Sequence, residues 1–471
     1  MNNQEENRKD LSYSSKKATA YSFGQLPVII SYQGFTFLVF TFYFAVVGLN
    51  VVLITLGFII WSIWNGLNDP FLGTLSDKTH TKWGRRLPWL MFSLIPIAII
   101  MFLLFTPPIT FGIEGQIPNF MYFIIIIIIF ELFFSMFDIN YISLLPEVFI
   151  NSEERTKANN FRQIFAIFGL LIAFILPTLF IPDLTNRKYL INYQIYGIVV
   201  AIIIILGGLI FLKFTPKEKA EFKDDYKSAP SFANSIKLCI KNKSFRWFIP
   251  IEIANWFVYG MLPTIVPLYG KFVLGIGEGE SIFLALLLGI AFISAAFFMT
   301  VLWKPVVQKI GLRKAWLISM SIWIITFIPL FFIQDVISGL VVFFIIGIGL
   351  AGSLYIYDLI VADIIDEDEV NTGIRREAGY YGTLIFFQRL ATIFVFLTIS
   401  LVFTNVGWAV YEPEKVGPDV IFGLRALMCI FPALALLVAL VAIYKYPLDG
   451  EYLSQVKEKL RKIHEEKLSK I

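Results

Sequence analysis

Three residues with side-chain oxygen atoms follow one another at helical spacing inside an apolar stretch of the sequence. Asn65, Asn68 and Asp69 are three and four positions apart, so all three lie on one face of a predicted helix. Oxygen atoms that converge on one face can bind a small, hard cation or a proton. The pattern therefore predicts a site for a proton or a small cation.

The chain that carries these residues has the composition of a membrane protein. Of its 471 residues, 57% are hydrophobic, 16% are charged and 48 are Phe. Soluble domains carry about 25% charged residues. Apolar runs of the length that crosses a bilayer, about 20 residues, recur along the chain. This composition excludes a soluble globular protein.

The apolar runs are continuous, which favours helices over the alternating strands of a barrel. We predict an all-α integral membrane protein with spans at 20–45, 49–74, 87–107, 119–146, 158–181, 189–213, 246–270, 281–303, 315–334, 338–362, 380–405 and 421–444. The expected parts are an N-terminal segment 1–18, a six-helix bundle 19–214, a central loop 215–245, a second six-helix bundle 246–446 and a basic tail 447–471.

Lys and Arg residues are distributed unevenly among the predicted loops. The loops on the side of both termini hold most of them, and the opposite loops hold only Arg187, Lys188, Lys271 and Lys415. The positive-inside rule then predicts that both termini are cytoplasmic in a multi-pass protein of the cell (plasma) membrane. The net charge of +4 reflects this bias, so we expect no nucleic-acid partner.

The loop after the second predicted span carries a spaced motif. Gly73 is followed four positions later by Asp77, and then by Gly84, Arg85 and Arg86. A Gly near a helix end allows close approach of a neighbouring helix, and Asp77 can pair with either arginine or cap the next helix. The motif resembles the loop motif of the major facilitator superfamily, where it is a conformational latch.

A second copy of part of this loop supports the same fold. Residues 84–90 read GRRLPWL, and 311–317 read GLRKAWL at the equivalent place in the second half. Parallel six-helix halves, with the solute site near the midplane between them, are the architecture of the major facilitator superfamily. The expected fold is therefore that of this superfamily, with twelve transmembrane helices in two halves.

Four further stretches resemble the glycoside–pentoside–hexuronide:cation symporters, the family of melibiose permease. Asn68-Asp69-Pro70 runs directly into the loop motif, as it does in that family. The other stretches are FYFAVVG at 42–48, the acidic to Arg-Arg-Glu segment at 362–382, and Gly423-Leu-Arg425 with Pro432 and Tyr446-Pro447-Leu448. The 362–382 segment, which we expect to be a loop, is the most specific.

The resemblance assigns the coupling cation to the face of Asn65, Asn68 and Asp69, with a hydroxyl from span four that matches Ser135. The family has an acid where Asn65 stands, so two carboxylates become one. A single carboxylate attracts Na⁺ less strongly but still carries a proton. The expected coupling ion is therefore H⁺ or Na⁺, with H⁺ favoured. The alternative is that Asp69 is a structural helix-end residue paired with the latch.

The resemblance also implies residues that contact the solute. Asp138 matches a carboxylate that binds sugar hydroxyls, which a carboxylate does by accepting two donors. Arg162 matches an arginine near the same site and is expected to neutralise or orient Asp138, the alternative being a structural pair. Arg389 stands where melibiose permease has a lysine, and the two are not interchangeable.

Three other polar residues within predicted spans are additional candidates. Glu131 precedes Asp138 by seven positions, so both can face the bundle interior. Asp358 is expected to be buried, since intramembrane charges face the protein interior, and pairing with Arg389 is considered. Gln33 is one of the few polar groups of span one, and it leaves the solute class open between sugars and amphipathic molecules.

The resemblance implies a secondary active transporter that performs cation-coupled symport of a sugar, glycoside, uronide or related small solute by alternating access. A lysolipid transporter of the same fold is the main alternative. A membrane enzyme or sensor is disfavoured, because the two histidines, His80 and His464, fall in a loop and the tail. We expect no cofactor, no metal beyond Na⁺, and a monomer whose partners are the solute and the bilayer.

Overall fold

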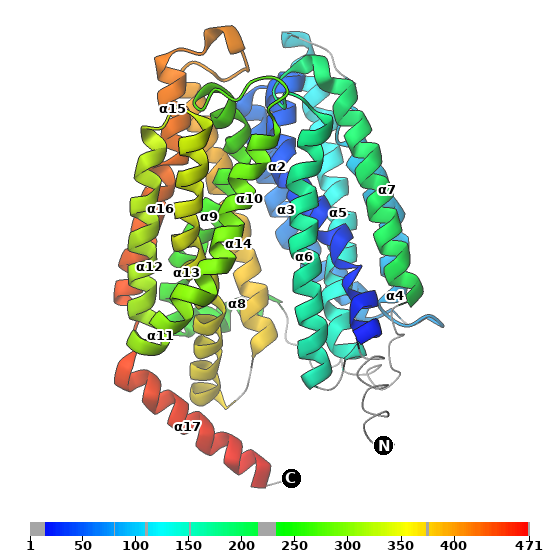
Figure 1. Ribbon diagram of the computed structural model, residues 1–471. Helices are drawn as coiled ribbons and strands as arrows, with labels where there is room; N and C mark the ends of the chain where they lie inside the picture. The colour runs from blue at the N-terminus through cyan, green and yellow to red at the C-terminus, as the bar shows by residue number, and fades with distance from the viewer. Residues whose placement is uncertain are drawn as a thin grey trace, which may run out of the picture. The chain divides into compact units, whose positions relative to one another are not determined.

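The computed structural model describes residues 15–79, 81–108, 112–149, 152–214, 232–373 and 376–469. Within these ranges the chain is helical and has no β-strand (Figure 1). His80, Arg375, residues 1–14 of the N-terminal segment and residues 215–231 of the central loop lie outside the described residues.

Eleven of the described helices are long and apolar enough to cross a membrane, and a further apolar helix, Leu87–Leu103, is slightly shorter. Together they account for the twelve predicted spans. A helix satisfies its own backbone hydrogen bonds, which lipid cannot do, so long apolar runs in a bilayer form helices. The expectation of an all-α membrane fold is confirmed.

The chain forms two compact units, and we describe each by itself. The first comprises Met1–Ala229 with Gly277–Ile282, and the second comprises Pro230–Ile276 with Phe283–Ile471. In the first unit the helices are α2 (Gln25–Thr41), α3 (Val51–Asp77), α4 (Leu87–Leu103), α5 (Gln116–Val148), α6 (Ser152–Phe180) and α7 (Leu190–Phe214). Helix α2 continues as a π-helix over Phe42–Val47.

Helix α5 is the central packing partner of the first unit, where it lies against both α3 and α4. The side chain of Gln116 joins the start of α5 to the start of α3. It accepts a hydrogen bond from the backbone N–H of Asn50 at 2.8 Å and donates one to the backbone carbonyl of Gly48 at 2.9 Å. Asn50 also caps α3 through its own side chain. These contacts set the register in which α3 and α5 face each other.

The second unit contains the remaining helices. They are α8 (Phe232–Lys241), α9 (Lys243–Phe272), α10 (Ile282–Phe298), α11 (Lys304–Ile310), α12 (Leu312–Phe327), α13 (Val336–Thr372), α14 (Glu377–Asn405), α15 (Pro418–Met428), α16 (Ile430–Lys445) and α17 (Gly450–Ser469). Helix α9 packs against α14 and α16, and α12 packs against α13 and α16. Ile282, the first residue of α10, is grouped with the first unit.

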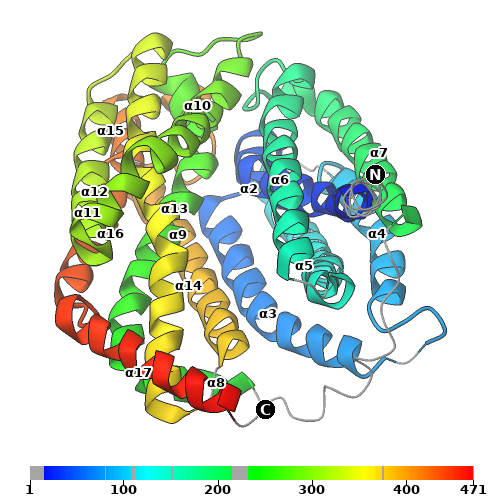
Figure 2. The ribbon, with the colours of Figure 1, turned by 60° about the horizontal axis from the view of Figure 1, so that its bottom comes forward.

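The acidic segment that we expected to form a loop at 362–382 is helical as far as Thr372, so this expectation is wrong. Its carboxylates are matched by basic partners that follow in the chain. Lys457 of α17 lies 2.5 Å from Asp363 and 2.8 Å from Asp366, and Figure 2 shows α17 crossing the end of α13. Paired in this way, the acids are compatible with a continuous helix.

Two further contacts close the same end of α13. Arg376 binds Asp368 through two nitrogen atoms, at 2.5 and 2.8 Å. The Tyr452 hydroxyl donates to Glu367 at 2.7 Å, and this hydrogen bond raises the pKa of Tyr452 to about 12. The basic tail predicted at 447–471 is therefore an ordered helix over Gly450–Ser469 with specific partners.

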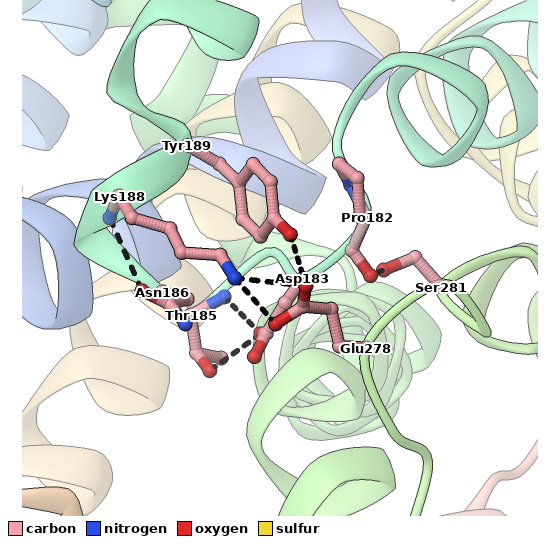
Figure 3. Close-up of polar contacts among 8 residues, drawn as sticks. All are labelled: Pro182, Asp183, Thr185, Asn186, Lys188, Tyr189, Glu278 and Ser281. Carbon is pink, nitrogen blue, oxygen red and sulfur yellow. Dashed lines mark hydrogen bonds and ion pairs between the residues drawn. The ribbon is translucent and has the colours of Figure 1, made fainter.

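The connection between α9 and α10 is held by contacts that belong to the first unit (Figure 3). Lys188 donates to both carboxylate oxygens of Glu278 at 2.8 Å. The Ser281 hydroxyl donates to the Pro182 carbonyl at 2.7 Å. A charge-assisted pair and a backbone anchor therefore fasten this connection to the loop between α6 and α7.

Candidate functional site

The face of α3 that carries Asn65, Asn68 and Asp69 lies against α5. Asn65 and Asn68 are buried, and Asp69 is half-buried. The Ser135 hydroxyl lies 2.5 Å from an oxygen of Asp69, and the Asn68 amide donates to the backbone carbonyl of Glu131 at 3.4 Å. The structure thus brings the three predicted α3 residues and Ser135 of α5 into one cluster.

Glu131 belongs to the same cluster. The Asn65 amide donates a hydrogen bond to Glu131 Oε1, and the Ser135 hydroxyl lies 3.0 Å from that same oxygen. The expectation of a single carboxylate at this site is therefore corrected to two, Asp69 on α3 and Glu131 on α5. The sequence carried a signal for this, because Ser135 follows Glu131 by four positions and the two share a helix face.

The cluster has more hydrogen-bond acceptors than donors. A hydroxyl carries one proton, so Ser135 can donate to Asp69 or to Glu131 but not to both at once, and ionised carboxylates only accept. The side-chain oxygens of Asn65 and Asn68 are buried and accept no hydrogen bond. Buried polar atoms are normally paired. A proton on one carboxyl, or a cation among the oxygens, would supply such a partner.

A second cluster in the first unit contains Asp138 and Arg162. Both lie near enough to Tyr21 and Tyr141 to act on these tyrosines electrostatically. The Tyr21 and Tyr141 rings stack with centroids 4.7 Å apart, and the Tyr21 hydroxyl donates to the Tyr141 carbonyl at 2.6 Å. The expected role of Arg162 in neutralising or orienting Asp138 stays a prediction, and both residues act on the same two tyrosines.

The tyrosine pair was not predicted from the sequence. Tyr141 follows Asp138 by three positions on α5, a spacing that places them on neighbouring parts of one face. The pair requires Gly24, because a Cβ there would lie 2.4 Å from the Tyr141 ring. Tyr21 and Tyr141 lie in apolar stretches of the sequence, so they could not be distinguished there from ordinary aromatic residues of the core.

The remaining candidates are placed as follows. Arg389 is half-buried on α14 of the second unit, and Gln33 is half-buried on α2. Asp358 of α13 is exposed, which corrects the expectation of a buried acid, and it makes no ion pair with Arg389 in the described chain. The adjacent Tyr357 is the residue that points toward α9, through a hydrogen bond to Glu252.

Two residues of the predicted latch, Asp77 and Arg86, belong to a polar network at the end of α3 that we predict to be cytoplasmic. Arg86 lies 2.6 Å from Asp77 through one nitrogen atom, and another nitrogen donates to the Ser76 hydroxyl at 2.6 Å. Ser76 in turn donates to Asn140 of α5. The expected pairing of Asp77 with an arginine of the motif is confirmed for Arg86, and the network joins α3, α4 and α5.

The two glycines of the motif have different roles. Gly84 has φ of +108°, a conformation that residues with a Cβ rarely adopt. A Cβ at Gly73 would meet no atom within 4 Å, so no described residue of the first unit packs closely against this position, and the expected approach of a helix stays a prediction. Its neighbours Thr74 and Leu75 are exposed.

Comparisons with known proteins fit this arrangement. The family model described as "MFS/sugar transport protein" matches residues 20–450. An uncharacterised symporter from Synechocystis sp. is 23% identical, over 94% of this chain and 96% of that protein. Sodium-dependent lysophosphatidylcholine symporter 1 from Gallus gallus is 24% identical, over 86% of this chain and 81% of that protein.

A solved structure shares the fold. The crystal structure of the nucleoside transporter NupG aligns with a TM-score of 0.64 at 15% identity, over 92% of this chain and 100% of that chain. At this level of identity the similarity concerns the fold alone.

Proposed function

The chain belongs to the MFS/sugar transport protein family, so it is a secondary transporter of the membrane and not an enzyme. We propose that it couples solute movement to a gradient of H⁺ or Na⁺. The coupling ion binds at Asn65, Asn68, Asp69, Glu131 and Ser135. The observation that carries this proposal is the single Ser135 hydroxyl placed between two carboxylates, 2.5 Å from Asp69 and 3.0 Å from Glu131.

The binding of a cation follows from the charges at this position. Two carboxylates that share one hydroxyl repel each other when both are ionised, and the repulsion is relieved when one is protonated or when a cation lies between them. Inside a membrane protein such a pair is costly without this relief. Loading and unloading of the ion therefore changes how tightly α3 and α5 are joined. Coupling requires that this change also alter the binding of the solute.

Both ions are compatible with the side chains present. A proton needs only one carboxyl oxygen, whereas Na⁺ is held by several oxygen atoms, and the cluster offers those of two amides, two carboxylates and one hydroxyl. The second carboxylate removes the earlier reason to favour H⁺, which was the presence of Asp69 alone. The coupling ion is identified by measuring which of the two gradients drives uptake.

For the solute we propose a sugar, glycoside, uronide or related small polar molecule. The description of the family supports this class, as does the position of Asp138 beside the stacked rings of Tyr21 and Tyr141. Carboxylates accept hydrogen bonds from hydroxyl groups, and aromatic rings cover the apolar faces of a sugar. Arg162 and Arg389 are proposed as further solute-binding residues.

A lysolipid is the second proposed solute class. It is favoured by the similarity to a lysophosphatidylcholine symporter along 86% of the chain. In either case we propose a monomer in the cell membrane with both termini in the cytoplasm, a placement supported by the excess of Lys and Arg in the loops on that side.

The test uses the purified full-length protein in sealed lipid vesicles. Uptake of labelled sugars, glycosides, uronides and lysophosphatidylcholine is measured under an imposed Na⁺ gradient, an imposed H⁺ gradient, both or neither. Asp69→Asn and Glu131→Gln are compared with Asp419→Asn, which removes an exposed carboxylate at the start of α15. We expect one gradient to drive accumulation of at least one solute in the unmodified protein and in Asp419→Asn.

In Asp69→Asn and Glu131→Gln, equilibration of the solute without accumulation is expected, since the ion no longer binds. Accumulation that survives both substitutions would refute the proposed ion site. Uptake of every solute class that ignores both gradients would refute symport itself.

A further inference from the structure

A fully buried carboxylate that does not belong to the proposed ion site lies in the second unit. Glu252, in the first half of α9, has 0% of its surface exposed. One of its oxygens, Oε1, accepts hydrogen bonds from the Tyr357 hydroxyl of α13 at 3.0 Å and from the Gln388 amide of α14 at 2.9 Å. The other oxygen, Oε2, is buried and accepts no hydrogen bond.

No basic residue compensates this carboxylate. Within the described chain Glu252 forms no ion pair, and the charged group with an electrostatic effect on it is another acid, Asp358 of α13. The nearby donors are neutral, namely Tyr357, Gln388 and the Trp256 indole. Tyr259, a further titratable group on α9, bonds instead with Ser353 at 3.0 Å.

Among the described residues, the cations of α14, α15 and α16, three helices packed against α9, form no ion pair with Glu252. Arg425 of α15 acts on Tyr269, which is 17 positions further along α9, or about 25 Å. Lys445 of α16 lies over the Trp247 ring at 5.3 Å. Arg389 of α14 follows Gln388 in sequence but forms no ion pair with Glu252.

A bare carboxylate in this position is unfavourable. Burying an ionised carboxylate without a cation costs far more than burying its neutral form. A proton removes the charge without requiring additional space, and there is no exposed surface at Glu252 through which a larger ion makes contact. One turn further along α9, Asn255 is also fully buried, and neither atom of its amide has a hydrogen-bond partner. The region is therefore polar and incompletely satisfied.

We propose that Glu252 is a second proton-binding site, located in the second unit, whose affinity for the proton is set by Tyr357 and Gln388. The carboxylate binds H⁺ to form the carboxylic acid, and no other bond changes. Because the two donors lie on α13 and α14, a movement of either helix against α9 removes a donor that stabilises the ionised form, and the carboxyl then holds its proton more tightly. The physiological role of this site rests on the proposed symport, to which it would add a second proton-binding step.

The test is infrared spectroscopy of the full-length protein in lipid at a series of pH values, without solute or ion gradient. The expected signal is the carbonyl band of a protonated carboxylic acid that shifts in deuterated water and is lost in Glu252→Gln. Glu451→Gln, which changes an exposed acid of α17, should leave the band intact. Tyr357→Phe should move the band's titration by about one pH unit to higher pH, a tenfold change for one hydrogen bond to a charged group.

The proposal is overturned if no band disappears in Glu252→Gln, or if the titration of the band is the same in Tyr357→Phe and Gln388→Leu as in the unmodified protein. The last two variants keep the proposal testable if Glu252→Gln does not fold. The band is measured without transport, so the two proposals fail in different ways. If the proton site is wrong, no band depends on Glu252. If symport is wrong, gradient-driven uptake is absent while the Glu252 band persists.

Discussion

The side-chain amide of Asn65 on α3 donates a hydrogen bond to the carboxylate of Glu131 on α5. The resemblance of the motifs to the glycoside–pentoside–hexuronide:cation symporters leads us to expect an acid where Asn65 stands. In this protein the second carboxylate of the cluster therefore comes from the neighbouring helix. The two carboxylates of the cluster, Asp69 and Glu131, thus lie on different helices.

Replacing Asn65 by Asp should destabilise the protein at neutral pH. The new carboxylate would face Glu131 without a donor, and an unsatisfied buried group costs about 1–3 kcal/mol. The double variant Asn65→Asp with Glu131→Gln restores one amide and one carboxylate, and should recover most of the lost stability. Thermal unfolding in detergent measures both variants.

The penalty of Asn65→Asp should also shrink as the pH is lowered, because protonation of either carboxyl removes the repulsion. Asn405→Asp, at an exposed position near the end of α14, serves as the control and should have little effect. Equal stability of the single and double variants at neutral pH would contradict the proposed contact.

Gly24 and Gly73 should respond differently to the same substitution. A Cβ at Gly24 would lie 2.4 Å from the Tyr141 ring, whereas at Gly73 it would meet nothing within 4 Å. Gly24→Ala should therefore cost about 1–3 kcal/mol through overpacking. Gly73→Ala should be neutral or stabilising by up to about 1 kcal/mol, as for Gly to Ala in a helix interior. Unfolding midpoints that fall equally in both variants would disprove this assignment.

Arg86→Lys should impair the latch network although it conserves the charge. Arg86 uses separate nitrogen atoms for Asp77 and Ser76, both at 2.6 Å, and an ammonium group cannot reproduce this fork. We expect a several-fold slower initial rate of uptake in vesicles with little loss of thermal stability. Arg461→Lys, which alters an exposed arginine of α17, is the matched control. An unchanged rate in Arg86→Lys would argue that the network is only structural.

Lys457→Met should loosen the contact between α17 and α13. The substitution leaves Asp363 and Asp366, both buried, without their cation. Because the Lys457 side chain is 45% exposed, we expect the free energy of unfolding to fall by about 1–2 kcal/mol. Breaking a fully buried pair would cost about 3–5 kcal/mol. Proteolysis of α17 should be faster in this variant. In Lys462→Met, which breaks an exposed pair within α17, the rate should not change.

Much of the fold was predictable because it depends on local composition. Each span is a run of apolar residues long enough to cross a bilayer, and the lipid requires such a run to be helical. The prediction was wrong at 362–372, where the sequence is acidic and polar. That segment stays helical because Lys457 and Tyr452, more than 80 positions away, provide the partners for its acids.

The candidate ion site was predictable in part. Asn65, Asn68 and Asp69 share a helix face by spacing alone, and spacing is a local property of the chain. Glu131 was only an additional candidate, although its spacing to Ser135 places both on one helix face. Glu252 was not predicted, because a lone acid in an apolar run gives no periodic signal that identifies its partner.

The sequence by itself therefore determined that this is a helical membrane transporter with an oxygen-rich face on its second span. Only the tertiary structure decided which acids complete that face and which acid is buried without a cation. The physical reason is that helical periodicity orients side chains within one helix, whereas the packing of α5 on α3, and of α13 and α14 on α9, depends on contacts between residues more than 60 positions apart.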